Sequence, residues 1–114
     1  MPTKTMKAHW LQILLAVADG PQHGTAIMEE VLERTDGAMK LWPGTLYGSL
    51  RELEAEGWLR ETEAPEGAPT EGGKRRFYGI TPDGSVSLAA EIRRLESFVQ
   101  TARAKRVIDR AVSK

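Results

Sequence analysis

The chain contains no cysteine, and this absence removes several kinds of site at once. Without thiols there is no disulfide framework, no thiolate metal site and no cysteine nucleophile. The two histidines, His9 and His23, share no helix face with a second histidine or a carboxylate at metal-ligand spacing. The sequence therefore predicts neither a metal nor another cofactor, and a reducing compartment suits it.

Long apolar runs are also missing. No stretch approaches the roughly 20 apolar residues that a membrane-spanning helix needs. Gln12 and Asp19 interrupt the apolar stretch that follows the basic N-terminus, so no signal peptide is indicated. With 114 residues, 40% of them hydrophobic and 28% charged, the composition is that of one soluble globular domain. We expect a cytoplasmic protein with no membrane partner.

An excess of charge of one sign is the third absence, because 16 basic residues balance 16 acidic ones. Net charge thus gives no support to nucleic-acid binding, which usually shows as a basic surplus. The local distribution differs: residues 93–114 hold seven basic residues against Glu96 and Asp109, and Lys74, Arg75 and Arg76 form a basic triplet. Any nucleic-acid interface must come from such local surfaces.

Apolar residues recur at helical spacing through the first half of the chain. Trp10, Ile13, Leu14 and Val17 define one face of a helix over about residues 5–18, which Asp19-Gly20-Pro21 ends. A second helix follows His23-Gly24-Thr25 and ends near Thr35. A third begins at Pro43-Gly44, carries a leucine stripe and is capped by Gly57.

Two short strands and one long helix complete the pattern. Residues 58–63 and 74–80 read as a hairpin around a tip rich in proline and glycine, and Thr81-Pro82-Asp83 begins a helix over about 82–110. The expected fold is mainly α with a two-stranded β wing: a winged helix-turn-helix over 1–81 and a C-terminal dimerisation helix over 82–114, packed as one compact unit.

The third helix has the pattern of a helix that enters the major groove of DNA. Steps of about 100° per residue place Leu46, Leu50 and Leu53 on the inner side. The candidate DNA contacts lie on and beside the other face, and they are Thr45, Tyr47, Gly48 and Arg51. Small residues allow close approach, while hydroxyls and arginine reach phosphates or base edges. An ordinary solvated helix surface is the alternative interpretation of this face alone.

The hairpin strengthens the first interpretation, because a basic wing beside such a helix gains from neutralising phosphate. Lys74, Arg75 and Arg76 begin the return strand and are the candidate wing contacts. Strand alternation sends Arg75 and Arg76 to opposite faces, so at most one of these two arginines faces the DNA with the rest of the wing.

The long last helix carries a coiled-coil-like stripe of apolar residues at steps of four, three, four and three. This stripe predicts pairing with the first helix and with the same helix of a second subunit in a two-fold dimer. A helix that folds back on its own domain is the alternative. The candidate interface residues are Trp10, Leu14, Leu88, Ile92, Leu95, Val99 and Ala102.

Several segments together resemble the PadR-like family of transcriptional regulators in order and spacing. They are Ile-Leu-Leu-Ala-Val-Ala-Asp-Gly-Pro at 13–21, His-Gly at 23–24, Pro-Gly-Thr-Leu-Tyr at 43–47, Leu50, Leu53-Glu54, Glu56-Gly57, Arg-Arg-Phe-Tyr at 75–78 and Ile-Thr-Pro-Asp-Gly at 80–84. The resemblance covers nearly the whole chain. It departs from the family's common pattern at Thr25, where an aromatic residue is usual, at Gly79, where a basic residue is frequent, and in the acidic wing tip.

The resemblance implies a dimeric repressor that places the third helix in the major groove of a pseudo-palindromic operator. It also implies a site for small aromatic effectors at the dimer interface, for which Trp10 and Phe98 are the candidates. Aromatic residues on apolar faces belong to the core more often than to a ligand site.

Two other function classes compete with DNA binding. No nucleophile with its base, paired-carboxylate cleft or phosphate loop is present, so the sequence does not indicate an enzyme. The stronger alternative is a winged-helix dimer that binds proteins, because net charge is zero and the third helix carries Glu52, Glu54 and Glu56 beside one arginine. Carboxylates near phosphates weaken DNA binding.

Overall fold

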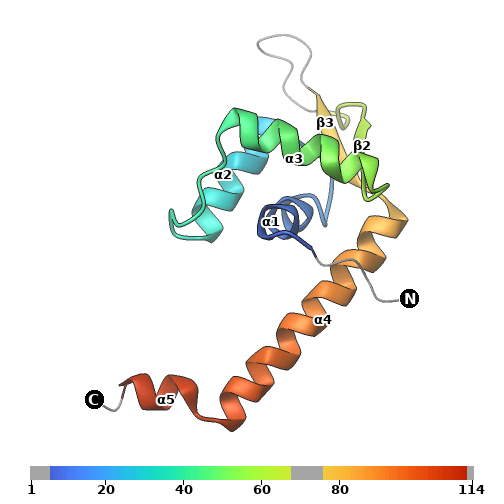
Figure 1. Ribbon diagram of the computed structural model, residues 1–114. Coiled ribbons are helices and arrows are strands. Elements are labelled where there is room, and N and C mark those ends of the chain that lie inside the picture. Colours follow the sequence, from blue (N-terminus) through green and yellow to red (C-terminus); the bar gives the residue numbers. More distant parts are fainter. Residues whose placement is uncertain (1–5, 68–75, 113–114) are drawn as a thin grey trace.

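The computed structural model describes residues 6–67 and 76–112 and confirms a mainly helical winged-helix fold. In Figure 1 the helices of the first half of the chain form a body with a small sheet beside them, and a long helix projects from this body. The elements in chain order are α1 (Ala8–Ala16), β1 (Gln22–His23), α2 (Gly24–Arg34), α3 (Pro43–Ala55), β2 (Leu59–Thr62), β3 (Phe77–Ile80), α4 (Pro82–Ala104) and α5 (Val107–Val112).

The core lies between α1, α2 and α3, where each helix turns its apolar face inward. The stripe expected on the third helix is confirmed, since Leu46, Leu50 and Leu53 are all buried. They pack in one cluster with Ile13 of α1 and Ile27 of α2. Burial of such side chains contributes about 1.5–3 kcal/mol each and fixes which side of α3 remains outside.

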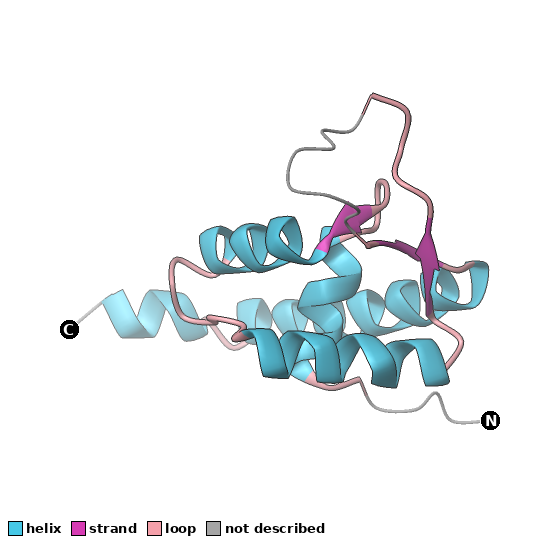
Figure 2. Cartoon of the chain, turned by 90° about the horizontal axis from the view of Figure 1, so that it is seen from above, coloured by secondary structure: helices cyan, strands magenta, loops and turns pink. Residues whose placement is uncertain are grey.

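The wing is anchored by a third strand that the sequence did not predict. β1 pairs antiparallel with β3 through Gln22 and His23, while β2 pairs with the other edge of β3, giving the order β1-β3-β2. In Figure 2 this sheet lies along the edge of the helical body. β1 has only two residues, so its sequence shows no alternation from which a strand can be recognised.

The start of α4 is fixed tightly to the turn between α3 and β2. The Thr81 hydroxyl accepts a hydrogen bond from the Gly84 N–H at 3.0 Å and donates to the Gly57 carbonyl at 2.6 Å, which confirms the expected helix cap. Gly84 lies so close to this turn that an added Cβ would be 2.1 Å from the Trp58 carbonyl oxygen. Gly57 itself adopts φ 79°, the left-handed conformation of a helix C-cap.

Beyond Glu91, α4 leaves the body and forms, with α5, an arm (residues 92–112) that points away from the wing (Figure 1). The radius of gyration is 16.5 Å, against about 13 Å for a compact domain of this length. None of the described helices combines the length and apolarity that crossing a bilayer requires.

The expectation of one continuous helix to residue 110 is wrong, because α4 ends at Ala104 and α5 begins at Val107. Arg106 adopts φ 57° and redirects the chain between them. The apolar steps that run through Val99 and Ala102 next reach Arg106 and Asp109, so the stripe that favours a continuing helix stops here.

Candidate nucleic-acid interface

The outer face of α3 presents the small and polar side chains expected of a groove-binding helix. Thr45, Tyr47 and Arg51 are exposed and Gly48 is half-buried, opposite the buried leucines. Neither Gly44 nor Gly48 has a neighbouring atom within 4 Å of an added Cβ, so open space lies over both. The face therefore combines room for close approach with a hydroxyl, a phenol and a guanidinium.

The side chain of Tyr47 on α3 extends toward the first turn of α2. Its hydroxyl would be 3.1 Å from a Cβ added to Gly24, so the glycine makes room for the phenol. At the same helix start, Nδ1 of His23 accepts a hydrogen bond from the Ala26 N–H at 3.2 Å, so this histidine caps α2. The ring of His23 also packs edge-on against Phe77 of β3, at 5.5 Å between centroids, so α2 is joined to the wing.

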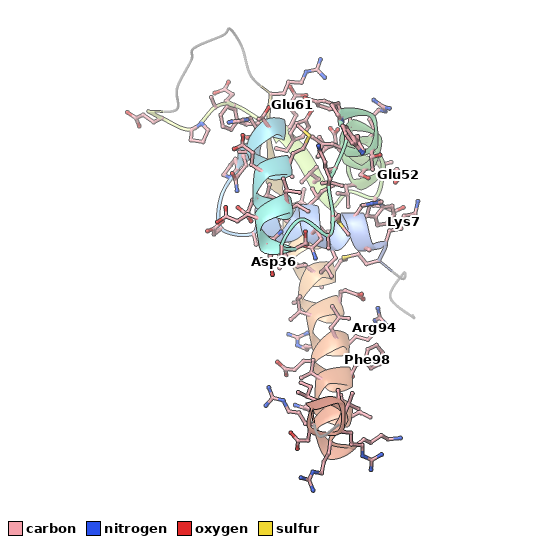
Figure 3. All side chains as sticks on the ribbon, turned by 90° about the vertical axis from the view of Figure 1, so that its left-hand side faces the viewer. Lys7, Asp36, Glu52, Glu61, Arg94 and Phe98 are labelled. Carbon is pink, nitrogen blue, oxygen red and sulfur yellow. The ribbon has the colours of Figure 1, made fainter. Side chains whose placement is uncertain are left out.

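The described part of the wing carries one member of the basic triplet. Arg76 is exposed, and its Nε lies 3.7 Å from Oε1 of Glu61 on β2, which Figure 3 labels. Lys74 and Arg75 lie outside the described residues. The Arg76–Glu61 distance is long for an ion pair between exposed groups, so the guanidinium loses little on exchanging the carboxylate for a phosphate.

Glu52, one of the two acids within α3, points toward α1 instead of outward, and Glu56 lies just beyond the end of the helix. Its carboxylate accepts hydrogen bonds from the Trp10 indole N–H at 3.0 Å and from the Lys7 ammonium at 3.1 Å. The Trp10 hydrogen bond, followed by the Lys7 bond, lowers the pKa of Glu52. This carboxylate is neutralised by its own subunit, which weakens the argument that acids on α3 repel DNA.

The PadR-like family model for transcriptional regulators matches residues 13–90, which include α2, α3 and both strands of the wing. This chain belongs to the PadR-like family. It is a transcriptional regulator built on a winged DNA-binding fold.

One curated relative is a named transcriptional regulator, and a second shares sequence with this chain. Transcriptional regulator Rv3488 of Mycobacterium tuberculosis is 34% identical over 90 residues, which cover 79% of this chain and 78% of that protein. A 37.1 kDa protein in transposon TN4556 of Streptomyces fradiae is 40% identical over 79 residues, 69% of this chain. The match spans only 20% of that second protein's length.

A solved structure shows the same fold. The PadR family transcription regulator of Clostridium difficile R20291 superposes with a TM-score of 0.71 at 20% sequence identity, covering 86% of this chain and 97% of that one. At this identity the likeness extends to the fold and not to individual side chains.

The PadR-like domain exposes one tryptophan that sequence reasoning missed. Trp42 is 61% exposed directly before α3, while Trp10 and Trp58 are buried. The ammonium of Lys40 lies 4.2 Å from the Trp42 ring centroid. Beside this pair is a hollow of about 250 Å³, and its other lining residues are Met28, Glu29, Leu32, Leu41 and Pro43. One sequence feature could have indicated this exposure: Trp42 directly precedes the Pro43-Gly44 start of α3 and lies outside the apolar stripes of the predicted helices.

The candidate interface residues of this PadR-like chain divide into two groups. Trp10 and Leu14 are 3% and 0% exposed within the single subunit, and Trp10 packs edge-on against Trp58, so both belong to its own core. Leu88 is buried where α4 leaves the body, and Leu95 and Ala102 are half-buried. Ile92 and Val99 are exposed at 37% and 48%.

The two candidate effector residues lie in different parts of the subunit. Trp10 contacts Glu52 in the body, whereas Phe98 is 55% exposed on the arm, and Figure 3 shows Glu52 and Phe98 well apart. The guanidinium of Arg94 lies 5.3 Å from the Phe98 ring centroid and binds both carboxylate oxygens of Glu91 at 2.9 and 2.6 Å. Glu91, Arg94 and Phe98 thus form a row of contacting side chains along α4.

Proposed function

We propose that this PadR-like protein is a homodimeric repressor that binds a pseudo-palindromic operator. The observation that carries the proposal is the two-sided character of α3: a fully buried leucine stripe fixes the helix, and its opposite face is open, small and hydrogen-bonding. A helix held in this way meets the groove in one orientation, which is what sequence-specific reading requires.

Thr45, Tyr47, Gly48 and Arg51 are the proposed groove and phosphate contacts of α3. Lys74, Arg75 and Arg76 are the proposed contacts of the wing. To these we add Trp42 and Lys40, whose exposed indole and ammonium lie at the leading end of α3. An indole N–H and an ammonium both donate hydrogen bonds, and phosphate oxygens accept them.

Homodimerisation is proposed from the apolar stripe of α4, in which Ile92 and Val99 are exposed in the single subunit. Leu88 and Ala102 each lie seven residues from Leu95, and Ile92 and Val99 lie three and four residues from it, so the stripe is symmetric about Leu95 to within one residue. When two copies of α4 run antiparallel about this residue, Leu88 meets Ala102 and Ile92 meets Val99 of the other copy. The stripe is therefore self-complementary under a two-fold axis, as an isologous interface must be.

Repression and its release are proposed to act through this dimer in the cytoplasm. Phe98 lies on the arm beside the stripe, so an aromatic effector bound between paired arms would contact it. Trp10 would sense such binding only through the body, because its ring is covered by Trp58 and hydrogen-bonded to Glu52.

A protein-binding winged helix remains the second candidate function. The observation in its favour is charge: the chain is neutral, and the exposed Arg76 already has Glu61 beside it. A surface of this kind attracts polyanions less strongly than a basic wing does.

Selection of bound sequences from a random duplex pool, followed by affinity against salt concentration, tests the proposal. We expect enrichment of an inverted repeat with half-sites about one helical turn apart, and a steep fall in affinity as salt rises. Equal, weak binding to every duplex, with and without aromatic compounds, would reject the repressor and favour the protein-binding module.

A further inference from the structure

The end of the arm is basic and apolar at the same time. This region, which we call the elbow (residues 99–110), holds Arg103, Lys105, Arg106 and Arg110 against one acid, Asp109. Val107 and Ile108 are 51% and 72% exposed on it. Among the described residues, no carboxylate lies within ion-pair distance of Arg103, Lys105 or Arg110.

The elbow is also bent around an open hollow. Arg106 is not a glycine, yet it adopts φ 57°, a conformation that costs energy for a residue with a Cβ. The bend encloses a hollow of about 480 Å³, and its lining residues are Val99, Ala102, Arg103, Arg106, Val107, Ile108 and Asp109. A bend that exposes two aliphatic side chains and costs backbone energy is best explained by a surface that packs into it.

A surface of complementary character lies on the outer side of α2. Glu29, Leu32 and Glu33 lie on one exposed face of α2, since they are spaced at three and four residues, and the exposed Asp36 follows in the turn after the helix. In the described chain no cation lies within ion-pair distance of these three acids, while neighbouring Arg34 is held by Glu30 and Gln12. We call these four residues the acidic stripe.

The spacing of the α4 residues brings the elbow of one subunit toward the body of the other. In an antiparallel pair centred on Leu95, Ala104 at the end of one α4 lies beside Val86 of the other copy, close to where that α4 joins its body, and the elbow continues from there. Figure 1 shows that α5 lies far from its own body, and Figure 3 shows Asp36 at the end of the body nearest the arm. The elbow thus reaches the partner's body and not its own.

We propose that the basic elbow of each subunit docks on the acidic stripe of α2 in the second copy of this chain. This inference rests on the proposed homodimer and adds to it a second, reciprocal contact on each side of the paired α4 helices. Val107 and Ile108 pack near the exposed Leu32, and the arginines of the elbow meet Glu29, Glu33 and Asp36. The contact connects the arm of one subunit to the DNA-binding helices of the other.

Cross-linking of two variants tests the contact, and the cysteine-free sequence makes each introduced thiol unique. Glu33→Cys and Arg110→Cys are purified separately, mixed at a concentration that allows exchange, and treated with a short bismaleimide. A covalent dimer that forms in the mixture, and in neither variant alone, is the expected result. It can arise only between one chain of each kind.

Leu95→Cys is the matched control for the dimer itself, because antiparallel pairing places this residue opposite its own copy. Cross-linking of Leu95→Cys without cross-linking of the mixture would overturn the elbow contact and leave the homodimer intact. If light scattering shows only monomers at every concentration, the homodimer is rejected, and the elbow contact is rejected with it.

Charge reversal gives an independent readout that does not depend on thiols. Arg110→Glu and Glu33→Lys are each expected to raise the dimer dissociation constant about two- to tenfold, as two symmetry-related surface ion pairs are lost. The chain with both changes restores opposite charges across the interface and recovers the dimer affinity. If Arg110→Glu weakens DNA binding while the dimer dissociation constant is unchanged, the elbow contacts DNA and the proposal fails.

Discussion

The Trp10 indole N–H donates a hydrogen bond of 3.0 Å to Oε1 of Glu52 and thereby joins α1 to α3. Lys7 binds the other carboxylate oxygen at 3.1 Å. The helix proposed to read DNA is thus tied to the first helix by a charged hydrogen bond at its surface. Both interactions favour the ionised carboxylate and lower the pKa of Glu52 below its ordinary value near 4.5.

Glu52→Gln should therefore change how stability depends on pH. A lowered folded-state pKa stabilises the fold at neutral pH, and this contribution is lost as the pH falls through that pKa. Urea unfolding at pH 7 is expected to show the wild type as the more stable protein. As the pH falls below 4.5 the difference between the two unfolding midpoints should shrink. A difference that stays constant from pH 7 through this acid range would contradict this account.

Gly84→Ala is expected to destabilise the junction between α3 and α4. The new methyl group would lie 2.1 Å from the Trp58 carbonyl oxygen, which is backbone and cannot move aside. Overpacking of this kind costs about 1–3 kcal/mol of unfolding free energy. Gly48→Ala is the matched control, because open space surrounds it, and it should instead gain about 0.5–1 kcal/mol of helix stability. Equal unfolding midpoints for the two variants would show that the junction tolerates a methyl group.

Local chemistry made much of the fold predictable. The leucine stripe of α3, the Gly57 cap and the Thr81-Pro82 start of α4 act within one or two helical turns, so their sequence signals carry their structures. Strand β1 could not be found in this way, since two residues become a strand only by pairing with β3. The bend at Arg106 could not be predicted either, because the left-handed conformation there is adopted by an arginine and not by a glycine.

For the candidate nucleic-acid interface, the sequence predicts the exposed face of α3 but not the residues that surround it. The exposed face of α3 follows from periodicity, because a buried stripe defines the opposite side. Periodicity predicts pairing through Trp10 and Leu14 because an apolar face does not say which element covers it, and within the subunit Trp58 packs against Trp10. The exposure of Trp42 depends on how α2 packs beside α3, which no local pattern encodes.

Tyr47→Phe and Tyr47→Ala separate the two roles of this side chain in DNA binding. Loss of the hydroxyl alone should weaken operator affinity about two- to tenfold, as expected for one hydrogen bond. Loss of the ring should weaken it further, while the unfolding midpoint changes little because Tyr47 is 42% exposed. Val86→Ala, at a side chain that is 70% exposed on α4, is the control and should bind as the wild type does. Wild-type affinity in both Tyr47 variants would remove this residue from the interface.

Trp42 offers a direct optical test of contact with DNA. Of the three tryptophans it alone is exposed, so a soluble quencher such as iodide should act mainly on its fluorescence. Saturation with the selected operator is expected to protect this emission, and Trp42→Phe should abolish the protected component and weaken affinity. Quenching that is identical with and without operator would place Trp42 outside the complex.

The paired arms give the last prediction, which concerns assembly. Ile92→Glu combined with Val99→Glu puts carboxylates opposite one another across the antiparallel stripe, where charges of like sign repel and lose hydration. Light scattering should then show monomers, while circular dichroism remains that of the wild type, because both side chains are already exposed in the single subunit.

A control variant and a DNA-binding measurement show whether the loss of dimers in the double variant comes from disrupted pairing of α4. Val86→Glu adds the same charge to an exposed site on α4 away from the stripe, and we expect it to remain dimeric. The monomeric variant should bind a single half-site as weakly as the wild type binds one, and should lose the added affinity of a full inverted repeat. A dimer that persists in the double variant would show that α4 pairs through another face, and the antiparallel arrangement about Leu95 would then be incorrect.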